Sequence, residues 1–297
     1  MTGGESNAAT AGSFALGHWR VNRVGYGAMQ LAGDNVFGPP RDRDEALRVL
    51  RAAIDSGINH IDTAQYYGPA VVNELIREAL YPYPSDLAIV SKVAARRDEA
   101  GAVLAYDDPD ELRAGLEENL VTLGLDRLAA VNLRLMDGSK PSERFDAQLA
   151  ALIEARDEGL IDGIGLSNIS RDQLRRAASQ TQIVCVQNLF NLADQRARGL
   201  LDDCTSQGIA FVPFLPLGWP GMAILTNPVL ADLGARLDAT PAQIALAWLL
   251  DLAPNVLLIP GTRTRQHLRE NIGSAALQLD DAARADLARH FPTLSAE

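Results

Sequence analysis

The stretch RDRDEALRVLRAAIDSGINHIDTAQYYG, residues 41–68, combines the two elements that recur along this chain. Its first part, residues 41–57, is charge-rich, repeats apolar residues at the spacing of one helical face, and ends in a glycine typical of a helix C-terminus. Its second part, Ile58–Asp62, is a short apolar run that predicts a strand, and a polar cluster follows it. A helix that leads into a buried strand is the repeating unit of α/β folds.

The same alternation continues on both sides of this stretch. Short β-rich runs predict strands at Arg23–Gly27, Ile58–Asp62, Leu87–Lys92, Ala129–Leu135, Gly163–Ser167, Ile183–Gln187, Ile209–Phe214 and Val256–Pro260. Helical periods with Asp, Ser or Pro start signals predict helices at 41–57, 108–124, 142–159, 171–179, 228–238 and 241–252. Eight units without an obvious linker, and no GxGxxG after an early strand, favour a closed (β/α)8 TIM barrel over an open Rossmann-type sheet.

The segments outside the repeat complete the predicted organisation. Residues 1–13 are small and polar and predict a flexible N-terminal tail, so that residues 14–297 form a single barrel domain. The segment FALGHWRVN (14–22) predicts a short N-terminal hairpin that caps the barrel floor. Two loops, 94–108 and 215–227, are longer than usual for connections that follow a strand, and long loops of this kind are typically functional.

Composition narrows the class of protein. The chain of 297 residues has a formal net charge of −11, which argues against a nucleic-acid partner because such a partner needs clustered Lys and Arg. Its two cysteines, Cys185 and Cys204, offer neither a disulfide framework nor a CxxC metal motif, so we expect no metal and a reducing cytoplasm. No apolar stretch has the length of a membrane helix. A small-molecule ligand is therefore the expected partner, and the oligomeric state cannot be read from the sequence.

Polar side chains gather at the predicted carboxyl ends of the strands, which is where the active site of a (β/α)8 barrel forms. They are Asp62 with Tyr67, Lys92, Arg134, Ser167 with Asn168, and Gln187. Each alone has a simpler interpretation as a helix cap or a solvated charge. Together they predict a site that combines a carboxylate, a phenol and cations in a small volume.

These residues also carry a resemblance to a known family. DTAQYYG (62–68), SK (91–92), GIGLSN (163–168), VQNLFN (186–191) and PLG (216–218) are similar, in order and spacing, to motifs of the aldo-keto reductases. The resemblance extends from about Arg23 to Asn271. It implies an NADPH-dependent oxidoreductase that reduces aldehyde or ketone carbonyls to alcohols.

The resemblance also implies roles for the polar side chains. Tyr67, immediately before a glycine, is the expected proton donor, and Lys92 is expected to lower the pKa of this phenol. Asp62 is expected to pair with Lys92 and keep it charged. Tyr66 is the rival phenol, and its simpler interpretation is packing against the barrel rim.

Arg134 stands where the family normally has a catalytic histidine, and none of the chain's histidines lies in that strand. A fixed cation can donate hydrogen bonds to a carbonyl but cannot relay a proton as imidazole does. Two interpretations stay open. Arg134 either binds a carbonyl or carboxylate oxygen of the substrate, or pairs with Asp62 or Asp137.

The expected cofactor, NADP(H), would lie across the barrel mouth. The nicotinamide is expected near Gly27, Met29 and Asp62, with Ser167, Asn168 and Gln187 at its carboxamide and Phe214 stacked on its ring. Pro216, Leu217 and Gly218 are expected at the pyrophosphate. The adenosine 2′-phosphate and adenine are expected at Gly261, Thr262, Arg263, His267, Glu270 and Asn271, with Gly261 where many relatives have lysine.

The substrate and two alternative functions are less constrained by the sequence. Apolar walls are expected from Met29, Leu31, Phe37, Met136 and Trp219. Because Arg134 stands in place of the family's histidine, an NADP(H)-binding redox sensor or regulatory subunit with little turnover stays open as an alternative function. A Schiff-base lyase or isomerase that uses Lys92 is disfavoured, because Asp62 would hold the amine protonated.

Overall fold

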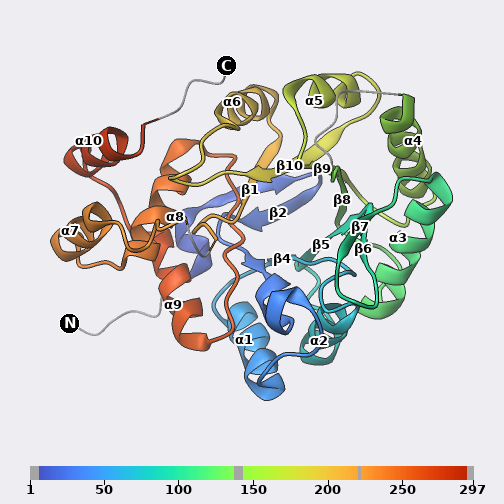
Figure 1. The fold of residues 1–297 in the computed structure, drawn as a ribbon, viewed down its shortest axis with the longest axis horizontal. Coiled ribbons are helices and arrows are strands. Elements are labelled where there is room, and N and C mark those ends of the chain that lie inside the picture. Colours follow the sequence, from blue (N-terminus) through green and yellow to red (C-terminus); the bar gives the residue numbers. More distant parts are fainter. Residues whose placement is uncertain (1–6, 137–142, 220–221, 293–297) are drawn as a thin grey trace.

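The computed structural model describes residues 7–136, 143–219 and 222–292. Helices surround a central group of strands, and the chain passes around this ring in sequence order (Figure 1). Within the described residues, no helix combines the length and the apolar character needed to cross a membrane.

A parallel sheet forms the centre of the molecule. Its strands, in the order in which they are hydrogen-bonded, are β11 (Ala210–Phe214), β10 (Ile183–Leu189), β9 (Ile164–Ser167), β8 (Ala130–Arg134), β5 (Ala88–Val93), β4 (His60–Asp62) and β3 (Tyr26–Gly27). Successive strands of the βα repeat are therefore neighbours, as a (β/α)8 barrel requires. The pairing places their carboxyl ends at one mouth.

The predicted eighth strand, Val256–Pro260, closes the barrel without forming a full ladder. Leu257 donates its N–H to the Phe211 carbonyl of β11 at 2.9 Å, and Leu258 donates to the Arg23 carbonyl at 2.8 Å. Only single bridges therefore join this segment to each neighbour, Phe211↔Val256 and Val24↔Leu258. The segment changes partner after one bridge, so it is too short on either side to count as a strand.

The helices follow the strands around the barrel. They are α1 (Arg43–Asp55), α2 (Val71–Leu80), α3 (Pro109–Leu123), α4 (Glu143–Asp157), α5 (Arg171–Ala178), α6 (Arg198–Gln207), α7 (Pro228–Leu237), α8 (Pro241–Leu252), α9 (Arg265–Gly273) and α10 (Asp281–His290). Helix α9 contacts α1, which completes the ring. Helices α7 and α10 lie outside it and pack with α8 in a separate apolar cluster (Figure 1).

Four of these helices, α2, α6, α9 and α10, lie outside the six predicted ranges. Helices α2 and α6 begin after Ala70 and Ala197, whose side chains cannot cap a helix, so the start signal is missing. Helix α10 has such a signal in Asp280, but this helix lies beyond the last strand, outside the alternation of strands and helices on which the prediction rested. The six predicted helices are present, with ends that differ from the predicted bounds by up to two residues.

The N-terminal hairpin forms as predicted. Strands β1 (Ser13–Leu16) and β2 (Trp19–Asn22) pair in antiparallel fashion. Their buried side chains Leu16 and Val21 share an apolar cluster with Ala88 and Ala130, the first residues of β5 and β8. The hairpin thus covers the amino-terminal ends of the barrel strands, which leaves the opposite mouth for the site.

The predicted flexible tail over residues 1–13 is wrong for its second half. Ala8–Ala11 form a short 3-10 helix, η1, capped by the Asn7 side chain. Ala8 is fully buried and donates its N–H to the Ser56 carbonyl at 2.9 Å, because a small side chain fits against the end of α1. Residues 1–6 lie outside the described residues. The assignment of residues 14–297 to a single domain stays a prediction.

The long loop 94–108 is more ordered than the sequence indicated. It contains an antiparallel hairpin of β6 (Ala95–Arg97) and β7 (Val103–Ala105), whose turn ends at Gly101 with a φ of +84°. The hairpin lies beside the ends of β5 and β8 (Figure 1). In the other long loop, 215–227, residues 220 and 221 lie outside the described part of the chain.

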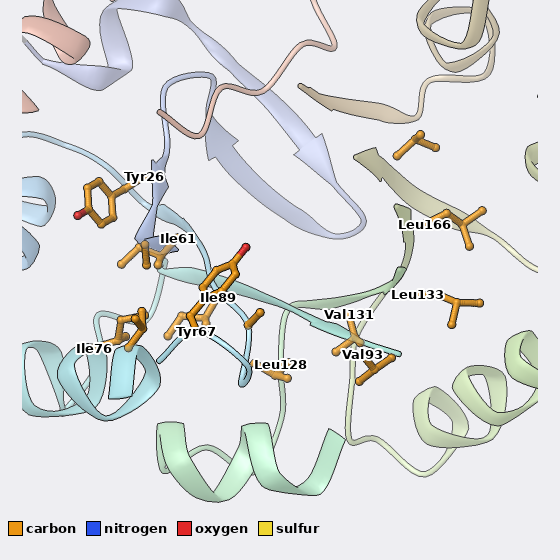
Figure 2. Packing of buried hydrophobic residues seen from close by; sticks show 14 of the residues in the cluster. Tyr26, Ile61, Tyr67, Ile76, Ile89, Val93, Leu128, Val131, Leu133 and Leu166 are labelled. Atoms are coloured by element: carbon orange, nitrogen blue, oxygen red, sulfur yellow. The ribbon is translucent and has the colours of Figure 1, made fainter. Parts of the chain in front are cut away.

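Aliphatic side chains of the strands and helices form the main core. Figure 2 shows Ile61, Ile89, Val131 and Leu133 along the barrel wall, with the Tyr67 ring in the same cluster. The tyrosine ring is therefore anchored by apolar packing while its hydroxyl group can face the mouth.

Candidate active site

A cavity of about 510 Å³ opens at the carboxyl ends of the strands. The predicted site residues that line it are Gly27, Met29, Asp62, Tyr67, Lys92, Arg134, Gln187, Phe214, Pro216, Leu217, Gly218 and Gly261. They come from the ends of β3, β4, β5, β8, β10 and β11 and from the closing segment. Side chains that are remote in sequence thus meet at one mouth.

A buried ion pair lies at the base of this cavity. The Lys92 Nζ atom donates to Asp62 Oδ1 at 2.5 Å and to the Thr63 carbonyl at 2.9 Å. Gln187 Nε2 donates to the second carboxylate oxygen, Asp62 Oδ2, at 2.7 Å. Both charged side chains are almost fully buried. The expected pairing is therefore present, and both oxygens of Asp62 have a partner.

The Tyr67 phenol lies over this pair, with Lys92 Nζ 5.1 Å from the ring centroid. The expected lowering of its pKa is wrong for this structure. Burial, followed by the charge of Asp62, raises the pKa of Tyr67 above its ordinary value, while Arg134 and a hydrogen bond with Tyr66 act in the opposite direction. The net pKa is therefore raised although the Lys92 ammonium lies next to the phenol ring. The Tyr67 hydroxyl is therefore a protonated donor at neutral pH.

Tyr66, the rival phenol, also lies at the barrel mouth. Its side chain is buried and lines the cavity, and its ring meets that of Tyr67 edge-on at a centroid distance of 5.0 Å. Burial also raises the pKa of Tyr66. Two neutral phenols are therefore adjacent in the cavity wall.

Arg134 reaches across the mouth from the end of β8. Its Nη1 atom lies 3.5 Å from Ser167 Oγ, and its guanidinium carbon lies 5.4 Å from the centroid of the Phe214 ring. Of the two carboxylates considered as partners, Asp62 is bonded to other groups, and no ion pair joins it to Arg134 within the described residues. Asp137 lies outside the described residues. The guanidinium therefore faces the cavity as a cation.

Two residues expected at the nicotinamide do not line the cavity. The Ser167 side chain is buried next to Arg134. Asn168 donates from Nδ2 to the Leu135 carbonyl at 2.6 Å, and its backbone has a positive φ of 60°. Gln187, in contrast, lines the cavity, and its buried Oε1 atom has no hydrogen-bond partner among the described residues.

The expected phosphate site lies at the N-terminus of α9, and two of its backbone donors are already used. The backbone N–H of Arg265 donates to the Glu45 carboxylate at 3.2 Å, and that of His267 donates to the capping Thr264 side chain at 3.3 Å. Arg263 Nε donates to the Gln30 carbonyl at 2.8 Å, which holds the guanidinium near the cavity edge.

The remaining residues of this expected site are spread along the same segment and do not line the cavity. Thr262 and Asn271 are buried, His267 is exposed, and Glu270 accepts a hydrogen bond from Gln266 at 3.1 Å. Packing explains why residue 261 is a glycine. A Cβ atom there would lie 2.7 Å from the Gly27 carbonyl and 3.1 Å from the Gln30 side chain. A lysine at this position would therefore require the Gly27 backbone to shift and the Gln30 side chain to give way.

Three of the five residues expected in the apolar wall line the cavity. Met29, Met136 and Trp219 line the cavity. Leu31 is instead buried in the core, and the Phe37 ring packs against Gly101 of the hairpin.

Several lining residues were not predicted: Gln30, Asn35, Val36, Tyr66, Arg97, Val103, Leu215, Ile259 and Pro260. Arg97 and Val103 come from the loop 94–108, whose length was the only signal. Among the described residues, no group of three or more His, Cys, Asp or Glu side chains could hold a metal ion.

Comparisons with known proteins are consistent with this geometry. A model of the Aldo/keto reductase family matches residues 23–290. The chain is 50% identical over 281 residues to pyridoxine 4-dehydrogenase of Escherichia coli (strain K12), which covers 94% of this chain and 98% of that protein.

Solved structures agree with this similarity. A thermostable aldo-keto reductase, solved with the inhibitor epalrestat, has a TM-score of 0.78 at 31% identity and covers 93% of this chain and 98% of its own. An aldo-keto reductase from Klebsiella pneumoniae, solved in complex with NADPH, shares the fold with a TM-score of 0.78 at 23% identity, and the match covers 93% of each chain.

Proposed function

The chain belongs to the aldo/keto reductase family, and we propose that it reduces aldehyde or ketone carbonyls to alcohols with NADP(H) as cofactor. One observation carries this proposal. The Tyr67 phenol lies over the buried Lys92–Asp62 pair in the wall of a cavity that is large enough for a small carbonyl compound. Carbonyl reduction needs a proton donor at oxygen, and this arrangement supplies one.

The cavity has features that fit a nicotinamide. The unpartnered Gln187 Oε1 atom is a buried acceptor, which a carboxamide N–H would satisfy. The Phe214 ring lines the same cavity and can stack on a planar ring. Gly218 and Gly261 also line this cavity. When bound, the reduced nicotinamide supplies the hydride.

In the proposed reaction the chain's own residues handle the proton. Tyr67, protonated at neutral pH, donates to the carbonyl oxygen as negative charge develops there. Lys92 then lies next to the resulting phenolate, and Asp62 keeps that amine charged and in place. Arg134 donates a hydrogen bond to the same oxygen, and it cannot act as a proton relay.

Pyridoxal is the substrate that we propose to test first, because the relative with 50% identity is a pyridoxine 4-dehydrogenase. Reduction of the aldehyde at position 4 of pyridoxal is the reverse of the oxidation which that name describes. A flat aromatic aldehyde suits a cavity walled by Met29, Met136, Trp219 and Phe214.

The test uses purified protein, NADPH and a panel of pyridoxal, benzaldehyde, aliphatic aldehydes and quinones. We expect aldehyde-dependent loss of reduced-nicotinamide absorbance, and Tyr67→Phe should lower the rate by at least about 100-fold while NADPH binding changes little. Tight NADPH binding without turnover of any panel member would refute the proposal and favour a redox sensor.

A further inference from the structure

We propose that Arg97 is a positioning residue for Tyr67: it fixes the turn that presents the phenol and adds a positive charge that favours proton release. This inference rests on the proposed function, since it concerns how that reaction is supported. Arg97 lies on β6 and lines the cavity, and neither its sequence context nor the family motifs point to it.

The Arg97 guanidinium joins three segments of the cavity mouth. Its Nε atom donates to the Tyr66 carbonyl at 3.2 Å, Nη1 to the Gly101 carbonyl at 2.5 Å, and Nη2 to the Asn35 carbonyl at 3.0 Å. These carbonyls belong to the turn after β4, the tip of the β6–β7 hairpin and the loop after β3. A planar fork of donors is suited to such a three-way contact.

The contact with Tyr66 acts directly on the catalytic turn. The Tyr66 carbonyl belongs to the peptide bond that leads into Tyr67, so the hydrogen bond limits rotation of that peptide. A second contact braces the same turn, because Gln65 Nε2 donates to the Ala95 carbonyl at 3.2 Å. The hairpin is thus attached to both of the residues that immediately precede the phenol.

The charge of Arg97 also reaches the phenol. Within the described residues, no carboxylate forms an ion pair with Arg97, although many surface arginines of this chain have one. The guanidinium acts on Tyr67 in the direction that lowers its pKa, against the effects of burial and Asp62. Removal of this cation should therefore make Tyr67 hold its proton more tightly.

A purely structural role for Arg97 predicts that stability, cofactor binding and turnover fall together when the residue is replaced. Strand β7 of the hairpin contributes little to the core, since Val103 and Leu104 are each 41% exposed. Loss of Arg97 should therefore leave the barrel folded. If the residue positions Tyr67, turnover should change more than stability or cofactor binding.

The experiment compares Arg97→Gln, Arg97→Lys and the matched control Arg96→Gln. Arg96 is the preceding residue on the same strand, but its side chain is exposed and paired with Glu111. For each protein we would measure kcat and KM with the best aldehyde, the NADPH Kd by nucleotide fluorescence, Tm, and the pH profile of kcat for oxidation of the product alcohol.

For Arg97→Gln we expect kcat to fall by about 10- to 100-fold, the range that a small misplacement of a catalytic group produces. The NADPH Kd should change by less than about twofold and Tm by only a few degrees. The pH at which alcohol oxidation levels off should move up, because Tyr67 must lose its proton in this direction. Arg97→Lys keeps the charge and should restore the pH profile more than kcat, and Arg96→Gln should match the parent.

The inference is overturned if kcat of Arg97→Gln stays within about twofold of the parent. It is also overturned if kcat, NADPH affinity and Tm of Arg97→Gln all fall to a comparable extent and kcat of Arg97→Lys is no higher than that of Arg97→Gln. Absence of turnover in the parent protein would instead refute the proposed function, so the two failures are distinguishable.

Discussion

The buried pair at the base of the cavity allows a quantitative test by a double-mutant cycle. The perturbations are Lys92→Met, Asp62→Asn and their combination. In the parent, Nζ and Oδ1 are 2.5 Å apart, and the two side chains are 2% and 4% exposed. Each single variant leaves one buried charge without its counter-ion, whereas the double variant leaves none.

The structure sets the expected size of the effect. Two unit charges at this distance attract with about 6 to 7 kcal/mol at an effective dielectric constant of about 20, and desolvation offsets much of this energy. Loss of one partner from a buried pair typically costs about 3 to 5 kcal/mol. We therefore expect each single variant to lose about that much stability. We expect the double variant to lose no more than one of them, which gives a coupling energy of about 3 kcal/mol.

Urea unfolding at pH 7, followed by circular dichroism for all four proteins at one ionic strength, gives these free energies. The exposed pair Arg96–Glu111 is the matched control, and its cycle should give a coupling energy below about 1 kcal/mol. A coupling energy for Lys92 and Asp62 as small as that of the control would refute the reasoning. The pair would then be solvated, and it could not hold Lys92 beside Tyr67.

Four further predictions follow from single side chains. Arg134→His should retain reductase activity and acquire a pH dependence near pH 6.5, the ordinary pKa of imidazole, in a profile of kcat against pH; an unchanged profile would contradict a role at the carbonyl. Arg263→Ala should raise the Kd of NADPH at least about 10-fold and that of NADH less than about twofold, measured by fluorescence titration, and equal losses would contradict a contact with the 2′-phosphate. Burial lowers the pKa of His60 from 6.5 to about 4, so its contribution to stability is complete above pH 6.5 and declines as the pH falls toward 4. His60→Leu should therefore flatten the pH dependence of urea unfolding between pH 7 and 5 by up to about 1.4 kcal/mol per pH unit, and parallel curves for the two proteins would argue against a buried neutral imidazole. Gly27→Ala places a Cβ atom 2.3 Å from the Ile259 carbonyl, so we expect a loss of about 1 to 3 kcal/mol and a lower Tm, whereas an unchanged Tm would show that the closing segment yields easily.

The barrel could be predicted from the sequence because its determinants are local. Short apolar runs, helical periods and glycine caps recur along the chain at the spacing of a βα unit. Helices α2 and α6 escaped prediction because a start signal is absent at Ala70 and Ala197. The residues at the strand ends were recognisable for a related reason, since a polar side chain after a buried strand stands out in the sequence.

The sequence by itself determined the repeating fold and the gathering of polar side chains, Asp62 and Lys92 among them, at one mouth, because strand ends of a barrel must meet there; the pairing of these two was implied by the family resemblance. Only the tertiary structure decided the proton affinity of Tyr67, since it depends on how burial and the nearby charges add up in three dimensions. It also decided that Arg97 bonds to the Tyr66 carbonyl, and that Glu45 occupies a donor at the start of α9. Those contacts join segments that are 31 and 220 residues apart, and no local pattern encodes them.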